Sequence, residues 1–427
     1  MPGNEEPGLP AAEDTAAGSP QGGPRKVFGV SRTVFTLGIV SFLTDVSSEM
    51  LIPVVPQFLK FVIGASAFSI GLIEGIAEST ASLLRVWAGY LSDRLGRPKL
   101  LTVIGYGLSA ASKPFFLVAG SWPHVLAIRF ADRFGKGIRS APRDVLIADV
   151  TEESSRGRAF GFHRAMDTAG ATLGPLVIVL LVWLLAGGIL PEQLGREHRA
   201  VYTLVFIAAS VPAVLGWLVL ALFVPERRRD EGQARPPELK LSALDTRFKL
   251  FLVVVTVFSI GNSSDAFLTL RARSAPINMG FLEFLWVYVM FNALSAAVSL
   301  KSGGLSDRIG RRPVIVAGWL VFALVYFGMA NVTSRAGLWF WFVLYGAYYG
   351  MTEGILRAYA VDLAPREMRG SAVGAYYTFA GAALLPASLI AGFLWDSVGP
   401  SGPFYYGALT SAVAAVLMLL LVRDTRR

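Results

Sequence analysis

Long runs of apolar residues, separated by short polar segments, recur along the whole chain of 427 residues. Most runs reach about 20 residues, the length that a helix needs to cross a hydrocarbon core of about 30 Å. Within lipid each backbone group must be satisfied inside its own segment, so the runs are predicted to be helices. We place twelve membrane-spanning helices, approximately at 34–60, 68–92, 99–120, 123–148, 159–187, 200–223, 248–270, 281–302, 313–333, 337–362, 370–394 and 402–422.

Composition and charge agree with a membrane protein. The chain is 54% hydrophobic and 16% charged, whereas about a quarter of the residues of a soluble domain are charged. With both termini in the cytoplasm, 23 Lys and Arg residues fall in cytoplasmic segments and 6 in exterior loops. This asymmetry predicts that orientation, and we expect a multi-pass protein of the plasma (inner) membrane. The net charge of +9 therefore reflects topology and contact with lipid, and no compact basic domain indicates nucleic-acid binding.

The polar segments divide the chain. Residues 1–32 contain few bulky apolar side chains and are predicted to be a disordered cytoplasmic tail. A six-helix bundle at 33–224 is followed by a polar linker at 225–247. A second six-helix bundle at 248–422 ends in a short tail at 423–427.

The pattern G-x-x-x-D-R-x-G-R occurs twice, starting at Gly89 and, 214 positions later, at Gly303. Each copy lies between two long apolar segments. With this duplicated pattern the chain resembles the major facilitator superfamily of secondary transporters, over about residues 30–422. The resemblance implies an all-α membrane protein of twelve transmembrane helices, in two pseudo-symmetric six-helix halves around a central site.

The resemblance also implies that the two repeated loops are conformational latches. A carboxylate at the end of one helix can rest against the positive N-terminus of a helix from the other half, and the glycines allow a tight turn. The alternative is that the loops only set topology. The predicted latch residues are Gly89, Asp93, Arg94, Gly96, Arg97, Gly303, Asp307, Arg308, Gly310 and Arg311.

The fifth predicted helix contains Gly170, Gly174 and Pro175, which resemble part of a motif associated with antiporters of this superfamily. Two small residues four apart let helices pack closely, and proline leaves a backbone carbonyl unpaired. Helix packing alone is the alternative interpretation.

Two carboxylates, Asp45 and Glu49, lie four residues apart on the first predicted helix. In a poorly solvated cavity, desolvation and mutual repulsion make it difficult to ionise both. We therefore predict that these two residues, with Asp167 on the fifth helix, carry protons. The alternative is that nearby arginines hold them ionised as structural partners.

The fourth predicted helix carries five bases with spacings of 4, 3, 3 and 4 residues, which place them on one arc. A charge at the bilayer centre costs about 2.5 to 3.5 kcal/mol, so this arc and other charges should face the interior. If part of the charge is uncompensated, anions should bind best; a closed structural network of ion pairs is the alternative. The predicted cavity residues are Glu78, Arg129, Asp132, Arg133, Lys136, Arg139, Arg143, Asp265, Glu353 and Arg357.

We predict a secondary active transporter, working as a monomer, that exports a small organic molecule in exchange for protons. Proton-coupled uptake of a nutrient or a metal-chelating organic acid is the main alternative. An intramembrane enzyme or a sensor is a distant one, because neither H-E-x-x-H nor G-x-S-x-G occurs. The chain also has no ATP-binding G-x-x-x-x-G-K-[ST] loop, so transport is predicted to use ion gradients. We expect no cofactor and no metal.

Overall fold

The structure, a computed structural model, describes residues 27–152, 155–185, 198–226, 245–365 and 368–422. Most of the predicted N-terminal tail (1–26), most of the predicted linker (227–244) and the C-terminal tail (423–427) lie outside these residues.

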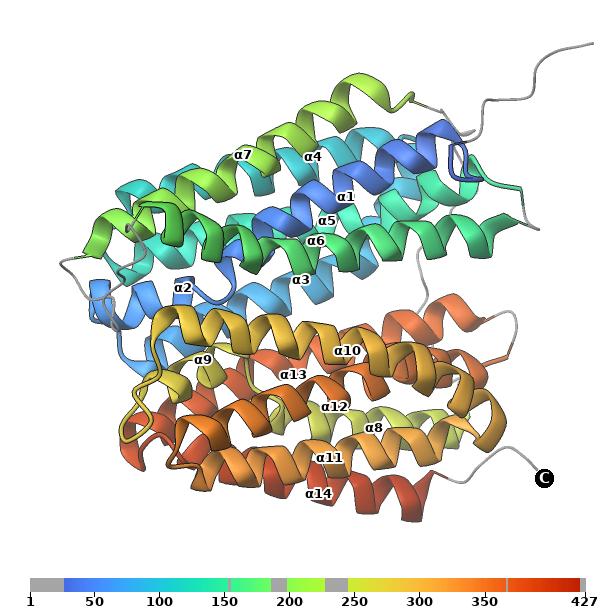
Figure 1. Cartoon of the computed structure of the whole chain (residues 1–427). Helices are drawn as coiled ribbons and strands as arrows, with labels where there is room; N and C mark the ends of the chain where they lie inside the picture. The colour runs from blue at the N-terminus through green and yellow to red at the C-terminus, as the bar shows by residue number, and fades with distance from the viewer. Residues whose placement is uncertain (1–26, 153–154, 186–197, 227–244, 366–367, 423–427) are drawn as a thin grey trace, which may run out of the picture.

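The described chain is helical and forms two halves, which lie one above the other in Figure 1. The first half contains α1 (Arg32–Leu51), α2 (Val55–Gln57), the π-helix η1 (Phe58–Ile63), α3 (Ala67–Leu95), α4 (Pro98–Ser112), the 3-10 helix η2 (Lys113–Val118), α5 (Trp122–Asp149), α6 (Arg156–Leu185) and α7 (Arg199–Phe223). The second half contains α8 (Thr246–Gly261), α9 (Ala266–Arg273), α10 (Phe281–Ile309), α11 (Arg311–Asn331), α12 (Arg335–Asp362), α13 (Arg369–Ser397) and α14 (Gly402–Leu421). The predicted all-α fold of twelve spanning segments in two halves is confirmed.

Three of the twelve segments are interrupted, although the sequence prediction drew them as continuous helices. The first breaks at residues 52–54, beside Pro53. The seventh breaks at 262–265, where Asn, Ser and Asp side chains compete for backbone hydrogen bonds. In the third segment α4 tightens into η2 at Lys113. Because the repeat offset is about 213, the first two breaks fall at nearly corresponding positions of the two halves, and paired broken helices are typical of transporter binding sites.

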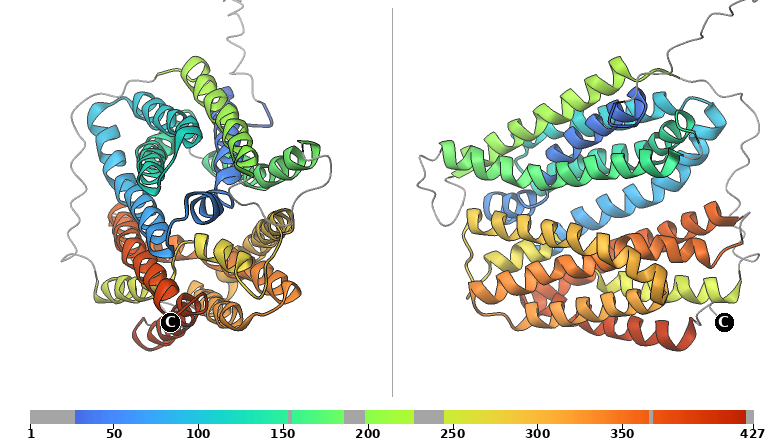
Figure 2. Two further views of the ribbon diagram at one scale, coloured as in Figure 1. Left: turned by 90° about the vertical axis from the view of Figure 1, so that its left-hand side faces the viewer. Right: turned by 45° about the vertical axis from the view of Figure 1, so that its right-hand side comes forward.

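We call the ends of the bundle the termini side, where α1 begins and α14 ends, and the far side, where α2 and α9 lie (Figure 1). The two halves are in contact along α3 and α13, where Gly71 and Gly381 lie close to residues of the opposite helix. On the far side, the Asp396 carboxylate of α13 accepts hydrogen bonds from Ala67 N (3.2 Å) and Phe68 N (2.9 Å) at the start of α3. The far side is therefore closed by contacts between the halves, and both views in Figure 2 show α2 close to the second half.

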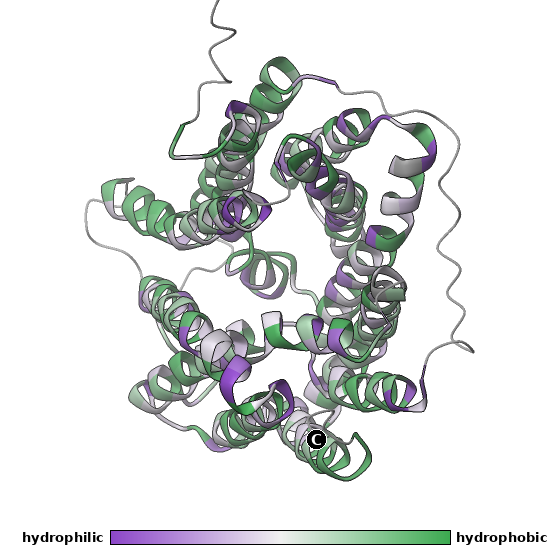
Figure 3. Ribbon diagram, turned by 90° about the vertical axis from the view of Figure 1, so that its right-hand side faces the viewer, coloured by the Kyte–Doolittle hydropathy of each residue, from purple (hydrophilic) through white to green (hydrophobic). Residues whose placement is uncertain are grey.

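Ten helical segments of the described chain are long and apolar enough to cross a membrane. Neither α5 nor α12 is among them, although both are 28 residues long. In Figure 3 the outer faces of the helices are mostly hydrophobic, and hydrophilic positions occur on helices around the middle of the view. The polar character of α5 and α12 is thus accommodated by packing inside the protein.

Candidate functional site

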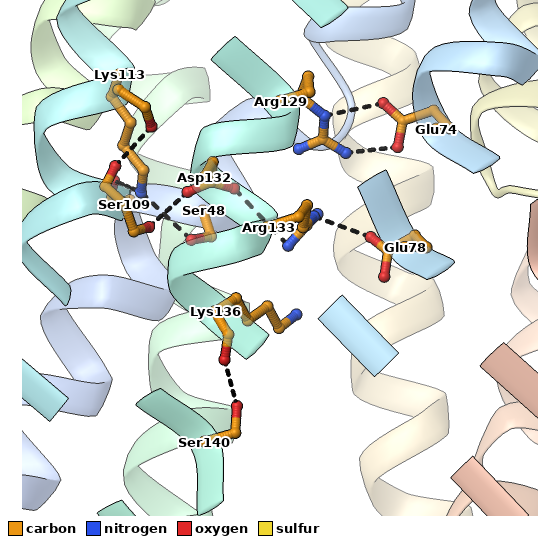
Figure 4. A network of polar contacts seen from close by, with 12 residues as sticks. Ser48, Glu74, Glu78, Ser109, Lys113, Arg129, Asp132, Arg133, Lys136 and Ser140 are labelled. Atoms are coloured by element: carbon orange, nitrogen blue, oxygen red, sulfur yellow. Dashed lines mark hydrogen bonds and ion pairs between the residues drawn. The ribbon is translucent and has the colours of Figure 1, made fainter. Parts of the chain in front are cut away.

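A ladder of ion pairs connects α3 to α5 in the first half (Figure 4). Arg129 donates from Nε to Glu74 Oε1 (3.0 Å) and from Nη2 to Glu74 Oε2 (2.5 Å). One turn nearer the termini side, Arg133 Nε lies 3.0 Å from Glu78 Oε1. The two helices are parallel, and the four-residue spacing on each brings both pairs into register. The Arg129–Glu74 pair is buried, so both partners depend on each other for charge neutralisation.

Asp132 and Lys113 extend the ladder toward α4 and α1. Ser109 donates a hydrogen bond to Asp132 Oδ1 (2.5 Å), and Arg133 Nη1 lies 4.0 Å from Asp132 Oδ2. The buried Lys113 ammonium donates to Ser47 Oγ and Ser48 Oγ of α1, the latter over 3.3 Å. Sequence analysis did not single out Lys113; its signal was a lone lysine inside an apolar span, directly before a proline.

The ladder contains equal numbers of cations and carboxylates: Lys113, Arg129 and Arg133 against Glu74, Glu78 and Asp132. Lys136, one turn further toward the termini side, is additional to this balance. In the described part of the chain no carboxylate oxygen lies within 4.0 Å of the Lys136 ammonium. Figure 4 shows its side chain extending on the side of α5 that Arg129 and Arg133 also face. Lys136 therefore has no direct ion-pair partner in the described part of the chain, although the charges of Glu78 and Asp45 act on it.

The two remaining bases of the α5 arc point toward other helices. The Arg139 guanidinium carbon lies 4.2 Å from the centroid of the Tyr106 ring on α4. Arg143 donates to Asp144 Oδ1 (3.0 and 3.2 Å) and to Ser41 Oγ of α1 (3.3 Å). The arc thus spans contacts with α3, α4 and α1, and only part of it faces the ladder.

The predicted proton carriers Asp45 and Glu49 lie where α1 packs against α6. A Cβ at Gly170 would be 3.0 Å from the Cβ of Asp45, and a Cβ at Gly174 would be 2.9 Å from the Cβ of Glu49. The two glycines of the predicted antiporter-like motif therefore let α6 approach the two turns that carry the carboxylates. Tyr288 of α10 donates a hydrogen bond to Glu49 Oε2 (2.9 Å), which connects this carboxylate to the second half.

Asp167 lies one turn from Gly170 on α6, and its Oδ2 is 3.5 Å from His163 Nδ1. Its charge acts on Asp45, together with those of Lys136, Arg139 and Arg143. The structure therefore brings the three predicted proton carriers together around the α1–α6 contact, within reach of the field of Lys136.

In the second half, Asp265 lies at the break between α8 and α9. Tyr345 of α12 donates to Asp265 Oδ1 (2.8 Å), and Asn262 donates from Nδ2 to Tyr348 Oη (3.2 Å). The broken helix is thus held by tyrosine hydroxyls, in contrast to the ion pairs of the first half.

Two predicted cavity residues, Glu353 and Arg357, lie one turn apart on α12. Glu353 Oε2 is 3.4 Å from Arg164 Nη2 of the first half, and both side chains are exposed. Arg357 donates to Tyr377 Oη of α13 (3.3 Å). These two residues lie apart from the ladder, closer to the termini side.

The two repeated motifs end α3 and α10. Gly96 and Gly310 have positive φ angles of 59° and 98°, so the turns there require glycine. Asp307 Oδ1 lies 3.7 Å from Arg311, which also pairs with Asp362 of α12. All of these partners belong to the second half. The Asp93 side chain lies outside the described part of the chain.

The fold and this site define a polytopic membrane transporter with two similar halves and a charged interior. The family model described as Major Facilitator Superfamily matches residues 37–272 and 250–427. The chain therefore belongs to the major facilitator superfamily, which confirms the resemblance, and it is a multi-pass membrane transporter and not an enzyme.

Relatives and solved structures match along most of the chain. An uncharacterised MFS-type transporter of Methanocaldococcus jannaschii is 34% identical over 92% of this chain and 95% of its own length. Multidrug resistance protein MdtG of Enterobacter lignolyticus is 24% identical, covering 90% of each chain. The crystal structure of a POT family transporter in complex with 5-aminolevulinic acid superposes with a TM-score of 0.77 at 12% identity, covering 93% of this chain and 97% of that chain. At this identity the superposition concerns the fold alone.

Proposed function

We propose that this protein is a proton-coupled transporter of a small organic anion, working by alternating access between its two halves. The observation that carries the proposal is the position of Asp45 and Glu49. They lie at the α1–α6 contact, and Tyr288 of the opposite half holds Glu49. A change in the arrangement of the halves would therefore change the surroundings of a carboxylate, which is what proton coupling requires.

Lys136 supports the choice of an anion. Its charge is additional to the balanced ladder, and it lies within the field of Asp45. Protonation of Asp45 would leave the positive charge of Lys136 less compensated, and an anion would then bind more strongly. By linkage, a bound anion would favour protonation of Asp45 to the same extent.

We propose export in exchange for protons as the direction of transport. Gly170 and Gly174 of the antiporter-like motif pack directly against the carboxylate-bearing turns of α1, and a multidrug resistance protein is among the relatives. Symport with protons, which would support uptake of an organic acid, is the second candidate. It is favoured by the linkage between Lys136 and Asp45, since that linkage makes proton and anion bind together.

Reconstitution in liposomes tests the coupling and the direction. Organic anions that raise the melting temperature of the purified protein would be used as radiolabelled substrates under an imposed pH gradient. Antiport predicts accumulation in vesicles with an acidic interior, and symport predicts accumulation in vesicles with an alkaline interior. Each pH unit supplies about 1.4 kcal/mol per proton, the free energy of tenfold accumulation, so one proton supports roughly tenfold accumulation per pH unit.

The variants Asp45→Asn and Glu49→Gln should lose gradient-driven accumulation and keep substrate exchange without a gradient. Glu283→Gln is the matched control, because that carboxylate binds Trp339 and Arg335 at the start of α10, away from α1. Undiminished accumulation in both α1 variants would show that these carboxylates do not carry the protons. We further propose the plasma membrane as the location, with the termini side in the cytoplasm, as the distribution of Lys and Arg indicates.

A further inference from the structure

Two arginines from opposite halves approach one tyrosine near the termini side. Arg357 of α12 donates from Nη1 to Tyr377 Oη of α13 over 3.3 Å. The guanidinium carbon of Arg85, on α3, lies over the same ring, 4.7 Å from its centroid. Tyr377 is eight residues into α13 and Arg85 is ten residues before the end of α3. At about 1.5 Å per residue, both therefore lie about 12 to 15 Å inside the helix ends.

Neither arginine has an acidic partner in the described part of the chain, where no carboxylate oxygen lies within 4.0 Å of either guanidinium. Each guanidinium has five N–H donors. Arg357 uses one of them on Tyr377, while Arg85 Nε is buried without a hydrogen-bond partner. A cation at this depth needs a counter-charge or water, so the pair has unused donors and unused charge.

The neighbouring charges do not remove this excess. Glu353 lies one turn from Arg357 on α12, but it is already paired with Arg164 of the first half at 3.4 Å. The charges of Arg85, Glu353 and Arg357 all act on Tyr376, which places them around one region between the halves. Among the described residues of this region, the three guanidinium groups of Arg85, Arg164 and Arg357 therefore share the carboxylate of Glu353.

Arg85 lies at about the depth of Lys136, on the termini side of the ladder. A Cβ at Gly137 of α5 would be 2.7 Å from the Cβ of Leu84 on α3. Because Lys136 precedes Gly137 and Arg85 follows Leu84, these two cations lie at about the same depth. On α3 the carboxylates Glu74 and Glu78 pair with α5 nearer the far side, and the next acidic residue of α3 is Asp93. The cations that follow the ladder thus face a stretch of α3 without carboxylates.

We propose that Arg85 and Arg357, which contact the ring and the hydroxyl of Tyr377, form a carboxylate-binding site that the transported anion occupies on the termini side of the ladder. The planar guanidinium group matches a carboxylate with two parallel N–H donors. Because the two arginines come from opposite halves, the site exists only in arrangements that bring α3 and α12 to the same tyrosine. The inference rests on the proposed function in one respect, the anionic nature of the substrate.

Equilibrium binding of trifluoroacetate, followed by fluorine NMR, tests the site without transport. The full-length protein would be placed in nanodiscs of phosphatidylcholine, which carries no net charge. Arg85→Gln and Arg357→Gln should each raise the dissociation constant about tenfold. Arg335→Gln, a matched variant of an arginine at the far side that pairs with Glu283, should leave it unchanged. Arg85→Lys and Arg357→Lys, which keep the charge and lose the planar fork, should give intermediate values and serve as folded substitutes if a Gln variant does not fold.

Three results would overturn the inference. The first is binding in the Arg85 and Arg357 variants equal to that of the unchanged protein. The second is competition by lipid: phosphatidylglycerol in the nanodiscs would abolish trifluoroacetate binding to the unchanged protein and would have no effect on the two variants. The site would then hold a lipid headgroup. The third is inorganic phosphate displacing trifluoroacetate at far lower concentration, which would indicate a phosphate site. None of these depends on Asp45 or Glu49, so gradient-driven accumulation could still support the proposed function after the inference had failed.

Discussion

Replacing Gly174 with alanine should destabilise the contact between α6 and α1. The new methyl group would lie 2.7 Å from the Val46 carbonyl oxygen, 2.9 Å from the Glu49 Cβ and 3.2 Å from the Met50 nitrogen. Two of these three atoms are backbone and cannot rotate away, so the helices must separate. Overpacking of this kind costs about 1 to 3 kcal/mol. Alanine in a helix regains about 0.5 to 1 kcal/mol relative to glycine, which leaves a net loss of up to about 2.5 kcal/mol.

Gly161→Ala is the matched control on the same helix. A Cβ at Gly161 would meet no atom within 4 Å, so only the helix propensity should change, and this variant should gain about 0.5 to 1 kcal/mol. The difference between the two variants isolates the packing cost of about 1 to 3 kcal/mol.

Reversible unfolding in bicelles would measure both free energies, and accumulation under a pH gradient would report on Glu49. Separation of α1 from α6 should also disturb the 2.9 Å hydrogen bond between Tyr288 and Glu49, so Gly174→Ala should weaken proton coupling. Equal stability of Gly174→Ala and Gly161→Ala would refute the close contact described here.

Three other outcomes are expected. Glu74→Gln should lower the free energy of unfolding by about 3 to 5 kcal/mol, because it leaves Arg129 buried and uncompensated. Glu353→Gln should lower it by at most about 1 kcal/mol, since its ion pair is exposed. Urea unfolding measures both values. Lys136→Gln should weaken the binding of organic anions but not of neutral analogues and should leave the melting temperature nearly unchanged; a large loss of stability would instead make Lys136 a member of the ladder. If Asp307 acts as a latch, Asp307→Asn should favour states open at the termini side, and Asp396→Asn should favour states open at the far side, each by about 0.3 to 1 kcal/mol. The chain has no cysteine, so labelling of single introduced cysteines measures the balance between these states. Accessibility unchanged by both substitutions would contradict the two roles.

The sequence predicts the fold well because the signals for it are local and repeated. The length of each apolar run reports a membrane span, and the duplicated motif at Gly89 and Gly303 reports two related halves. The break at 52–54 is hidden because apolar residues continue on both sides of Pro53. The break at 262–265 is hidden because apolar residues flank its four polar residues, and the competition between their side chains and the backbone decides the geometry.

The sequence predicts which face of a helix a side chain occupies better than it predicts which side chain it contacts. Helical periodicity places Arg129 and Arg133 on the inner face of α5, and their spacing matches that of Glu74 and Glu78. That match could have suggested the two pairs. The contact of Tyr288 with Glu49, and that of Arg85 with Tyr377, depend on how the two halves meet, which no spacing within one helix reports. The latch residues, the proton carriers and the cavity residues therefore remain predictions that the experiments above address.

The polarity of α5 and α12 has a consequence for biogenesis. Neither helix is among the ten apolar spans, so we expect each to depend on its packing partners when it enters the membrane. The helices that α5 packs against most extensively, α3 and α4, precede it in the chain, and α10 and α11 precede α12 in the same way. A ribosome therefore delivers each polar helix after the surfaces that neutralise it, with Glu74 and Glu78 already in the membrane when Arg129 and Arg133 arrive. Moving α5 ahead of α3 by circular permutation should consequently impair insertion, even though the final set of contacts would be the same.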